Sequence, residues 1–332
     1  MIGAHGVRIA GAGSAVPDKI LSNHDLEKMM DTSHDWIVQR TGIHRRHIVD
    51  PSKGEGQLEL ATEAMRAAMN DAGMQGSDLD LIIHGSVTAE MTCPSNACRI
   101  SHALDAAPAG AFDIVAACSG FVYGLNLAES LVRTGRYRTV GVVGCDAMST
   151  VLDYTERTVS ILFGDAAGAV VLTRDDDPDR GCMYQTLHAD GSMWGSLYMP
   201  RRSEEIAPGD ENTAIRLGCL RMNGREIYKF AVTKFRQVIE EALRETNLTP
   251  DDVRHFVCHQ SNVRILESAK ERLGLPDEKV PSNIHEYGNT SAGSVGLLFD
   301  ELWKAGKVDD GDVIIFVAFG GGTTWGTSVW RV

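Results

Sequence analysis

The sequence predicts an α/β fold built from two similar halves that pack face to face. Short apolar runs alternate with longer helix-like segments along the whole chain, as in α/β proteins. The acidic, turn-rich stretch Thr173–Gly181 lies near the middle and marks the best place to divide the chain. The order helix, turn, acidic pair, strand occurs on both sides of it, with Leu79 matching Val253 and Gly135 matching Gly306, at offsets of 174 and 171 residues.

These observations give two predicted domains, residues 1–174 and residues 175–332. Runs rich in β-branched residues and bounded by turn residues predict strands. Longer segments with apolar residues three and four positions apart predict helices. The expected strands are Val7–Gly13, Leu79–Ser86, Ala111–Ala117, Thr139–Asp146, Ala166–Arg174, Val253–Gln260, Val313–Gly320 and Gly326–Val332. The expected helices are Glu59–Ala72, Ser119–Arg133, Gly224–Thr246, Val263–Leu273 and Ala292–Lys304.

Composition excludes several classes of protein. The net charge of −13 argues against a general nucleic-acid binder. No run of about 18 apolar residues occurs, so no membrane span is expected. The first residues lack the charged start and apolar core of a signal peptide. The seven cysteines form no Cys-x-x-Cys pair, which disfavours both a disulfide framework and a structural zinc site. We therefore expect a reduced, cytoplasmic protein without a metal.

Cys118 is the candidate nucleophile. It lies in "DIVAACSGFVYGL", at the end of a predicted strand and the start of a predicted helix. Unpaired N–H groups and the macrodipole at a helix N-terminus favour a thiolate, which is the reactive form of cysteine. On local sequence alone, however, a buried structural thiol is the more common use of such a residue.

Two polar residues occupy similar junctions. His259 follows a strand in "VCHQSN", and Asn289 lies in "EYGNTSAGS" before a helix. At the offset of 171 residues, Asn289 falls opposite Cys118. In α/β proteins ligands bind at the edge where strands give way to helices. A Cys/His/Asn set there would supply a nucleophile, a base or hydrogen-bond donor, and a second donor for a developing oxyanion.

Three successive glycines follow an apolar strand in "FGGGTTWG", residues 319–326. Glycine lets backbone N–H groups approach a substrate closely, so this loop is a candidate oxyanion hole. Simple permissiveness of a loop is the alternative explanation.

Together these segments resemble the β-ketoacyl-acyl-carrier-protein synthase III family of thiolase-fold condensing enzymes. "DIVAACSGFVYGL", "CHQSNVRIL", "YGNTSAGS", "FGGGTTWG", "DWIVQRTGIHRR" and "ERTVSILFGDAAGAVVL" occur in the family's order and span residues 7–332. The resemblance implies a five-layered αβαβα thiolase fold with two duplicated halves. It also implies a homodimer, no cofactor, and acyl-CoA and malonyl-acyl-carrier protein as substrates.

The family's mechanism implies specific roles. Cys118 would take the acyl group from acyl-CoA, initiating fatty acid synthesis. His259 and Asn289 would hydrogen-bond the enolate oxygen formed when the malonyl group loses carbon dioxide. The backbone N–H groups of Cys118 and Gly321 would hold the oxyanion of acyl transfer. The residues implied to bind CoA are Trp36, Arg40, Thr41, Arg157, Gly224, Tyr228 and Asn262.

Carrier-protein docking and acyl selection are implied in the same way. Carrier proteins are acidic, so a local basic patch is needed, for which Arg225, Arg264, Arg272 and Lys229 are candidates. Arg225 replaces the family's common Asn. Cys93 replaces a bulky aromatic that limits relatives to acetyl groups, which predicts room for a longer or branched acyl chain. The implied docking residues are Gln260, Ser261, Asn262, Val263, Arg264 and Lys229.

Most other functions with similar residues fit this sequence less well. Thiolases need a second cysteine and hydroxymethylglutaryl-CoA synthases a glutamate, where this chain has His259 and Asn289. Papain-like hydrolases carry a local cysteine signature that is absent here. A non-enzymatic acyl-binding protein would not need the full Cys/His/Asn set. Condensing enzymes of secondary metabolism, which make alkylquinolones or polyketide starters with the same three residues, stay open as an alternative.

Overall fold

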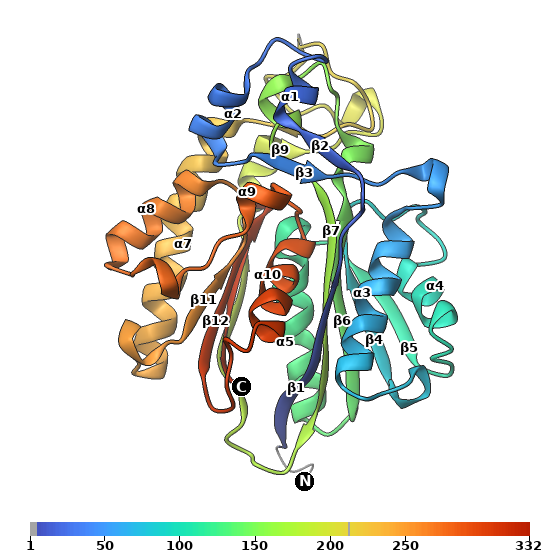
Figure 1. Cartoon of the computed structure of the whole chain (residues 1–332), viewed down its shortest axis with the longest axis vertical. Coiled ribbons are helices and arrows are strands. Elements are labelled where there is room, and N and C mark those ends of the chain that lie inside the picture. The colour runs from blue at the N-terminus through green and yellow to red at the C-terminus, as the bar shows by residue number, and fades with distance from the viewer. Residues whose placement is uncertain (1–4, 212) are drawn as a thin grey trace.

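Two β-sheets form the framework of the computed structural model, which describes residues 5–211 and 213–332 (Figure 1). The larger sheet has the strand order β1-β7-β6-β4-β5, and the smaller has the order β11-β12-β13-β8. The larger sheet contains β1 (Gly6–Ala15), β4 (Leu81–Gly85), β5 (Gly110–Ile114), β6 (Thr139–Ala147) and β7 (Asp165–Asp175). The smaller contains β8 (Gly181–Ala189), β11 (His255–Cys258), β12 (Val313–Gly320) and β13 (Thr324–Arg331).

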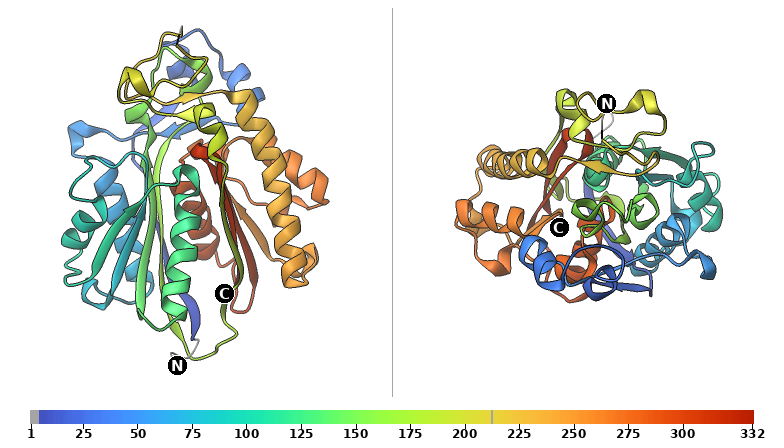
Figure 2. Two further views of the ribbon diagram at one scale, coloured as in Figure 1. Left: turned by 180° about the vertical axis from the view of Figure 1, so that it is seen from behind. Right: turned by 90° about the horizontal axis from the view of Figure 1, so that it is seen from above.

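Helices cover both outer faces and fill the space between the sheets (Figures 1 and 2). Helices α3 and α4 pack on the larger sheet, α7 and α8 pack on the smaller, and α5 and α10 lie between the two. The predicted αβαβα thiolase-like fold is therefore confirmed. These helices are α3 (Gln57–Asp71), α4 (Asn96–Ala103), α5 (Gly120–Arg133), α7 (Gly224–Thr246), α8 (Val263–Leu273) and α10 (Gly293–Lys304).

The central layer holds the main apolar core. Phe121 of α5 and Phe299 of α10 are fully buried and belong to the same cluster as Phe316 of β12. Most residues of both central helices are buried because each helix meets a sheet on either side. The core therefore fixes the starts of α5 and α10 relative to both sheets.

Backbone contacts bring these helices unusually close to the larger sheet. A Cβ on Gly85 would lie 2.7 Å from the carbonyl carbon of Gly120, at the start of α5. A Cβ on Gly168 would lie 2.2 Å from the backbone nitrogen of Leu297 in α10. Side-chain carbons do not approach other atoms so closely, so only glycine fits at Gly85 and Gly168.

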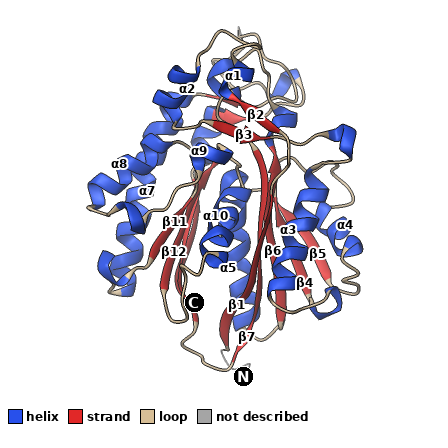
Figure 3. Cartoon of the chain, in the orientation of Figure 1, coloured by secondary structure: helices blue, strands red, loops and turns tan. Residues whose placement is uncertain are grey.

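A cap of short elements and loops covers one end of both sheets, as the colouring in Figure 3 shows. Its buried apolar residues, among them Ile37, Ile43 and Leu220, form a separate cluster. The cap contains β2 (Ile20–Ser22), β3 (Arg45–His47), β9 (Leu197–Tyr198), β10 (Arg221–Met222), α1 (Asn23–Leu26), α2 (His34–Thr41), α6 (Arg157–Ser160) and α9 (Ile284–Tyr287). None of the helices in the described ranges is both long and apolar enough to cross a bilayer.

Most predicted elements occur close to their expected bounds. Helices Gly224–Thr246 and Val263–Leu273 and strand Val313–Gly320 begin and end where predicted. The predicted strand Ala111–Ala117 ends earlier, at Ile114, because Ala117 has a φ of +46° and enters a tight turn. The two sheets take their strands from residues 6–175 and 181–331, and the division into domains 1–174 and 175–332 stays a prediction.

Candidate active site

Cys118 lies in a tight turn between β5 and α5. Residues Ala117–Ser119 form one 3₁₀ turn, and α5 begins at the next residue. Thr324, at the start of β13, stabilises this turn, because its Oγ1 donates a hydrogen bond to the carbonyl of Ala116 at 3.0 Å. The side chain of Cys118 is buried. Cys118 therefore lies between a strand and a helix, as the sequence predicts.

The expectation that the helix N-terminus would favour a thiolate is wrong for this structure. Burial raises the pKa of Cys118 to about 12, and the Asp146 charge adds to the rise. The hydroxyl of Ser291 donates to Sγ of Cys118 at 3.4 Å and opposes that shift. Desolvation of the charged thiolate outweighs the hydrogen bond from Ser291, so Cys118 is a neutral thiol near neutral pH.

His259 directly follows β11. Its backbone N–H donates to the carbonyl of Val317 at 2.8 Å, continuing the sheet by one residue. Its Nδ1 lies 2.7 Å from Oγ of Ser294, and its ring meets the edge of Phe319 with centroids 5.3 Å apart. Burial lowers the pKa of His259 to about 3, so the imidazole is neutral at physiological pH.

Asn289 lies in the loop before α10. Its backbone N–H donates to the carbonyl of Leu162 at 2.8 Å, and its own carbonyl accepts from Gly164 at 3.1 Å. Its side-chain Oδ1 accepts the backbone N–H of Ser291 at 2.9 Å. The oxygen of the amide is thus occupied, which leaves the NH₂ group as the part that can serve a ligand.

One cavity brings the three predicted residues together. It has a volume of about 670 Å³, and Cys118, His259 and Asn289 all line it. A second cavity of about 300 Å³ adjoins it at Cys118 and has mostly apolar walls, including Val87, Met148 and Leu220. Cys118 therefore lies where the larger cavity meets a smaller, mostly apolar one.

The glycine loop lies against the nucleophile turn. A Cβ on Gly320 would come within 2.7 Å of the backbone nitrogen of Cys118. Gly321 lines the smaller cavity beside Cys118. In the described part of the chain, the N–H groups of Cys118 and Gly321 donate to no acceptor outside their own short turns. Cys118 and Gly321, whose N–H groups are the predicted oxyanion donors, thus both border the smaller cavity.

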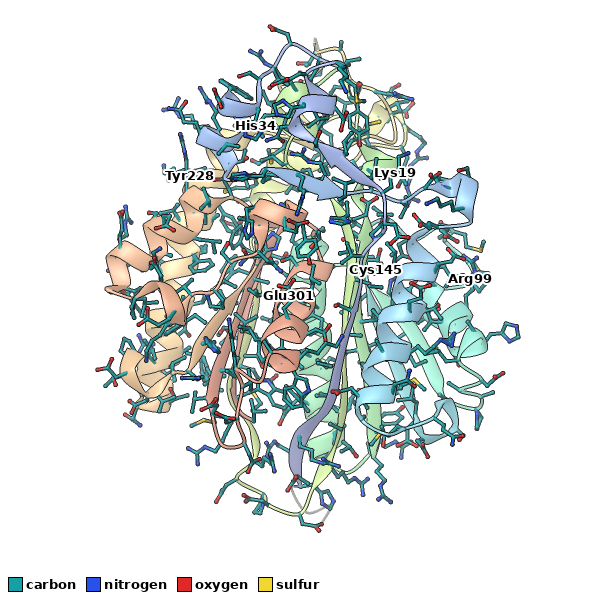
Figure 4. All side chains as sticks on the ribbon, in the orientation of Figure 1. Lys19, His34, Arg99, Cys145, Tyr228 and Glu301 are labelled. Carbon is teal, nitrogen blue, oxygen red and sulfur yellow. The ribbon has the colours of Figure 1, made fainter. Side chains whose placement is uncertain are left out.

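Most of the predicted CoA residues line the larger cavity. Figure 4 shows Tyr228 near the capped end of the molecule, and Tyr228 is one of the residues that line the cavity. Arg157 does not line it, because its guanidinium lies over the Trp36 ring, 5.2 Å from the centroid, and bonds to Asp31. Arg40 stacks on the same ring at 5.0 Å. The predicted residues that do line the cavity are Trp36, Arg40, Thr41, Gly224, Tyr228 and Asn262.

The predicted docking residues divide into surface and interior. Lys229 and Arg264 are exposed, and Val263 is partly exposed. Gln260 is fully buried in this structure, and its contact with a carrier protein stays a prediction. Its amide donates to the carbonyl of Cys258 and accepts from Ser282, which turns the side chain inward. Ser261 lines the larger cavity and is almost fully buried.

Cys93 is exposed and lines neither cavity of its own chain. The family resemblance implies that this position projects across the dimer interface into the acyl pocket, and this stays a prediction. No group of three or more His, Cys, Asp or Glu residues within residues 5–211 and 213–332 has the arrangement of a metal site.

Sequence reasoning missed two serines of the site. Ser291 and Ser294 contact the sulfur of Cys118 and the ring of His259. Both occur in the quoted segment "YGNTSAGS", where Ser291 precedes α10 and Ser294 is the second residue of that helix. Serines before a helix most often serve as caps, so their residue type gave no signal of this role.

Comparisons with known proteins agree with this geometry. The chain matches the family model for 3-oxoacyl-[acyl-carrier-protein] synthase III over residues 112–191 and the model for its C-terminal part over residues 243–332. It is 44% identical to the β-ketoacyl-[acyl-carrier-protein] synthase III of Caldanaerobacter subterraneus subsp. tengcongensis, over 97% of this chain and 96% of the relative.

Solved structures show the same likeness. The crystal structure of 3-oxoacyl-[acyl-carrier-protein] synthase III from Aquifex aeolicus VF5 is 39% identical, with a TM-score of 0.90 over 98% of this chain and 100% of that one. The priming β-ketosynthase of the R1128 polyketide pathway is 32% identical, with a TM-score of 0.91 over 100% and 98%. The higher identity to synthase III relatives favours that function over the polyketide alternative. This chain therefore belongs to the β-ketoacyl-acyl-carrier-protein synthase III family of acyltransferases.

Proposed function

We propose that this chain condenses an acyl-CoA primer with malonyl-acyl-carrier protein, giving a 3-oxoacyl-carrier protein, CoA and carbon dioxide, and so initiates fatty acid synthesis. The observation that carries the proposal is the convergence of Cys118, His259 and Asn289 on one cavity. Family membership gives this convergence its chemical meaning, because a nucleophile and two neutral donors are what decarboxylative condensation requires.

Acyl transfer is the first step. The sulfur of Cys118 attacks the thioester carbonyl of acyl-CoA, the bond from that carbon to the CoA sulfur breaks, and the cysteine proton leaves with CoA. The N–H groups of Cys118 and Gly321 hold the oxyanion that forms on the way. Because burial raises the pKa of Cys118 to about 12, the sulfur enters this step as a neutral thiol. The apolar cavity beside the sulfur receives the acyl chain.

Decarboxylation and carbon–carbon bond formation follow. The bond between the malonyl methylene and its carboxylate breaks, carbon dioxide leaves, and the electron pair forms an enolate. His259 and the NH₂ group of Asn289 donate to the enolate oxygen, where negative charge develops. The enolate carbon then attacks the acyl carbonyl on Cys118, the sulfur leaves as a thiolate, and a proton from solvent restores the thiol.

The mouth of the larger cavity is suited to an anionic, pantetheine-bearing substrate. Arg40, Arg225 and Arg264 line it and supply positive charge for phosphate groups. Trp36 offers a face on which adenine can stack once Arg157 moves from the ring. Arg264 lines this cavity, and Lys229 directly follows the cavity-lining residue Tyr228; both side chains are exposed. These two residues, with Val263 and Asn262 beside Arg264 in the chain, bind the acidic carrier protein in this proposal.

A homodimer and a reducing, cytoplasmic location complete the proposal. Strand β5 is an edge of the larger sheet, and Val115 directly after it leaves 80% of its surface exposed. An apolar sheet edge of this kind is suited to pairing with a second copy. The reaction needs Cys118 as a free thiol, which a reducing compartment maintains.

The test is to incubate the protein with a panel of acyl-CoAs and measure adducts by mass spectrometry. We expect a single acyl group on the peptide that contains Cys118, and release of 3-oxoacyl product after addition of malonyl-carrier protein. Cys118→Ser should fold but form no thioester adduct. Cys98→Ser, which changes an exposed thiol, is the matched control and should retain the adduct. An adduct on another cysteine would overturn the nucleophile assignment.

A further inference from the structure

Ser294 contacts the catalytic histidine without reaching the cavity. It is the second residue of α10, and only 1% of its surface is exposed. Its Oγ lies 2.7 Å from Nδ1 of His259 and 3.1 Å from the backbone nitrogen of Gln260. Ser294 does not line the larger cavity, whereas His259 does. Any effect of Ser294 on the reaction must therefore act through the histidine.

The two contacts determine which atom carries each hydrogen. The backbone N–H of Gln260 can only donate, so Oγ of Ser294 is its acceptor. The hydroxyl hydrogen then needs an acceptor of its own, and within the described chain Nδ1 of His259 is the one in reach. If Nδ1 carried a hydrogen instead, the buried hydroxyl hydrogen would have no partner, which is strongly disfavoured. Nδ1 is therefore the acceptor.

A neutral imidazole whose Nδ1 accepts must carry its hydrogen on Nε2. Burial lowers the pKa of His259 to about 3, which excludes the doubly protonated ring near neutral pH. The ring therefore presents an N–H donor rather than a lone pair. Asn289 likewise has its acceptor occupied, because the backbone N–H of Ser291 donates to its Oδ1, and its NH₂ group remains as a donor.

We propose that Ser294 is a positioning residue that fixes His259 as the Nε2–H tautomer, so that it donates to the enolate oxygen during decarboxylation. This inference rests on the condensing function proposed above. The proposed role of Ser294 affects the two half-reactions differently. Acyl transfer uses the N–H groups of Cys118 and Gly321 and does not depend on the tautomer of His259. The hydroxyl of Ser294 thus supports the second half-reaction alone.

The first test is ¹⁵N NMR of wild-type protein labelled at histidine, with His259→Ala to assign the signal. We expect Nε2 of His259 to be protonated and Nδ1 to be unprotonated across pH 6–8. A wild-type ring with its hydrogen on Nδ1 would overturn the proposal. This measurement needs no turnover, so it remains decisive even if the proposed reaction is wrong.

The second test measures each half-reaction in Ser294→Ala and Ser294→Thr. We expect Ser294→Ala to acylate Cys118 within about twofold of wild type, while kcat for condensation falls about 10- to 100-fold with little change in KM. Ser294→Thr retains the hydroxyl and should recover most of that loss. Equal losses in both half-reactions, or no loss in condensation, would refute the assignment of Ser294. Failure of the wild-type protein to condense would instead refute the proposed function.

Discussion

The closest contact between the glycine loop and the nucleophile predicts the effect of Gly320→Ala. The new Cβ would lie 2.7 Å from the backbone nitrogen of Cys118 and 3.1 Å from that of Ser119, whereas ordinary contact begins at 3.4 Å. The backbone must therefore open by about 0.7 Å, the difference between these distances. Because Gly320 is extended, with a φ of −157°, this clash is the main cost of the substitution.

The magnitude follows from how a packed core responds. Overpacking of this kind costs about 1–3 kcal/mol of folding free energy. Displacing a nucleophile by up to about 1 Å costs on the order of 10²-fold in rate. Cys118 supplies both the sulfur and one oxyanion N–H, so a shift of its backbone disturbs both. We expect acylation to slow by about 10- to 100-fold, which corresponds to about 1.4–2.7 kcal/mol of activation free energy and is comparable to the loss of stability.

The assay is the rate of Cys118 acylation by acyl-CoA, followed by intact mass, alongside the urea midpoint of unfolding. Gly191→Ala is the matched control, because no atom lies within 4 Å of its added Cβ and its φ does not favour glycine. It should acylate and unfold like the wild type. Wild-type acylation by Gly320→Ala, with an unchanged midpoint, would show that the loop does not hold the nucleophile as described.

Four further predictions concern the size of the acyl pocket, the reactivity of the Cys118 thiol and the stability of the fold. Cys93→Phe should shift acyl-CoA preference from butyryl and longer chains toward acetyl, and strict acetyl preference in the wild type would contradict the family-based reasoning. Alkylation of Cys118 by iodoacetamide should rise about tenfold per pH unit from pH 7 to 10, because its pKa is raised to about 12. Ser291→Ala removes the donor to Sγ and should slow that alkylation about fivefold at every pH. Burial raises the pKa of Asp165 to about 6, so the folded state holds its proton more tightly than the unfolded state does. The free energy of unfolding should therefore fall by about 1 kcal/mol between pH 5 and pH 7.5 on account of this residue. Asp165→Asn should abolish that component in urea titrations, and an unchanged slope with pH would count against it.

Much of the fold could be predicted because its elements have strong local patterns. Helix α7 has a long amphipathic repeat, and strand β12 is a continuous apolar run, so both were predicted with their observed bounds. Strand β8 was missed because it lies at a sheet edge and mixes polar and apolar residues without regular alternation. The short strands of the cap depend on their tertiary partners rather than on local sequence.

The site was predictable to a similar degree. Cys118, His259 and Asn289 could be selected because each stands where a strand or loop gives way to a helix. The raised pKa of Cys118 could not be predicted from sequence, because desolvation outweighs the effect of the helix N-terminus. The degree of burial depends on how the whole core assembles. The interior position of Gln260 likewise depends on Ser282, which is distant in sequence.

The glycine contacts beneath the central helices bear on how this enzyme can acquire new substrates. Gly85 and Gly168 leave no space for a side chain, so the helices that follow Cys118 and Asn289 cannot be repacked one residue at a time. The walls of the smaller cavity come partly from the cap, at Leu197 and Leu220, where side chains rather than backbones meet. Directed evolution of acyl specificity should therefore find its tolerated changes in the cap, while libraries built on the central helices yield mostly inactive protein.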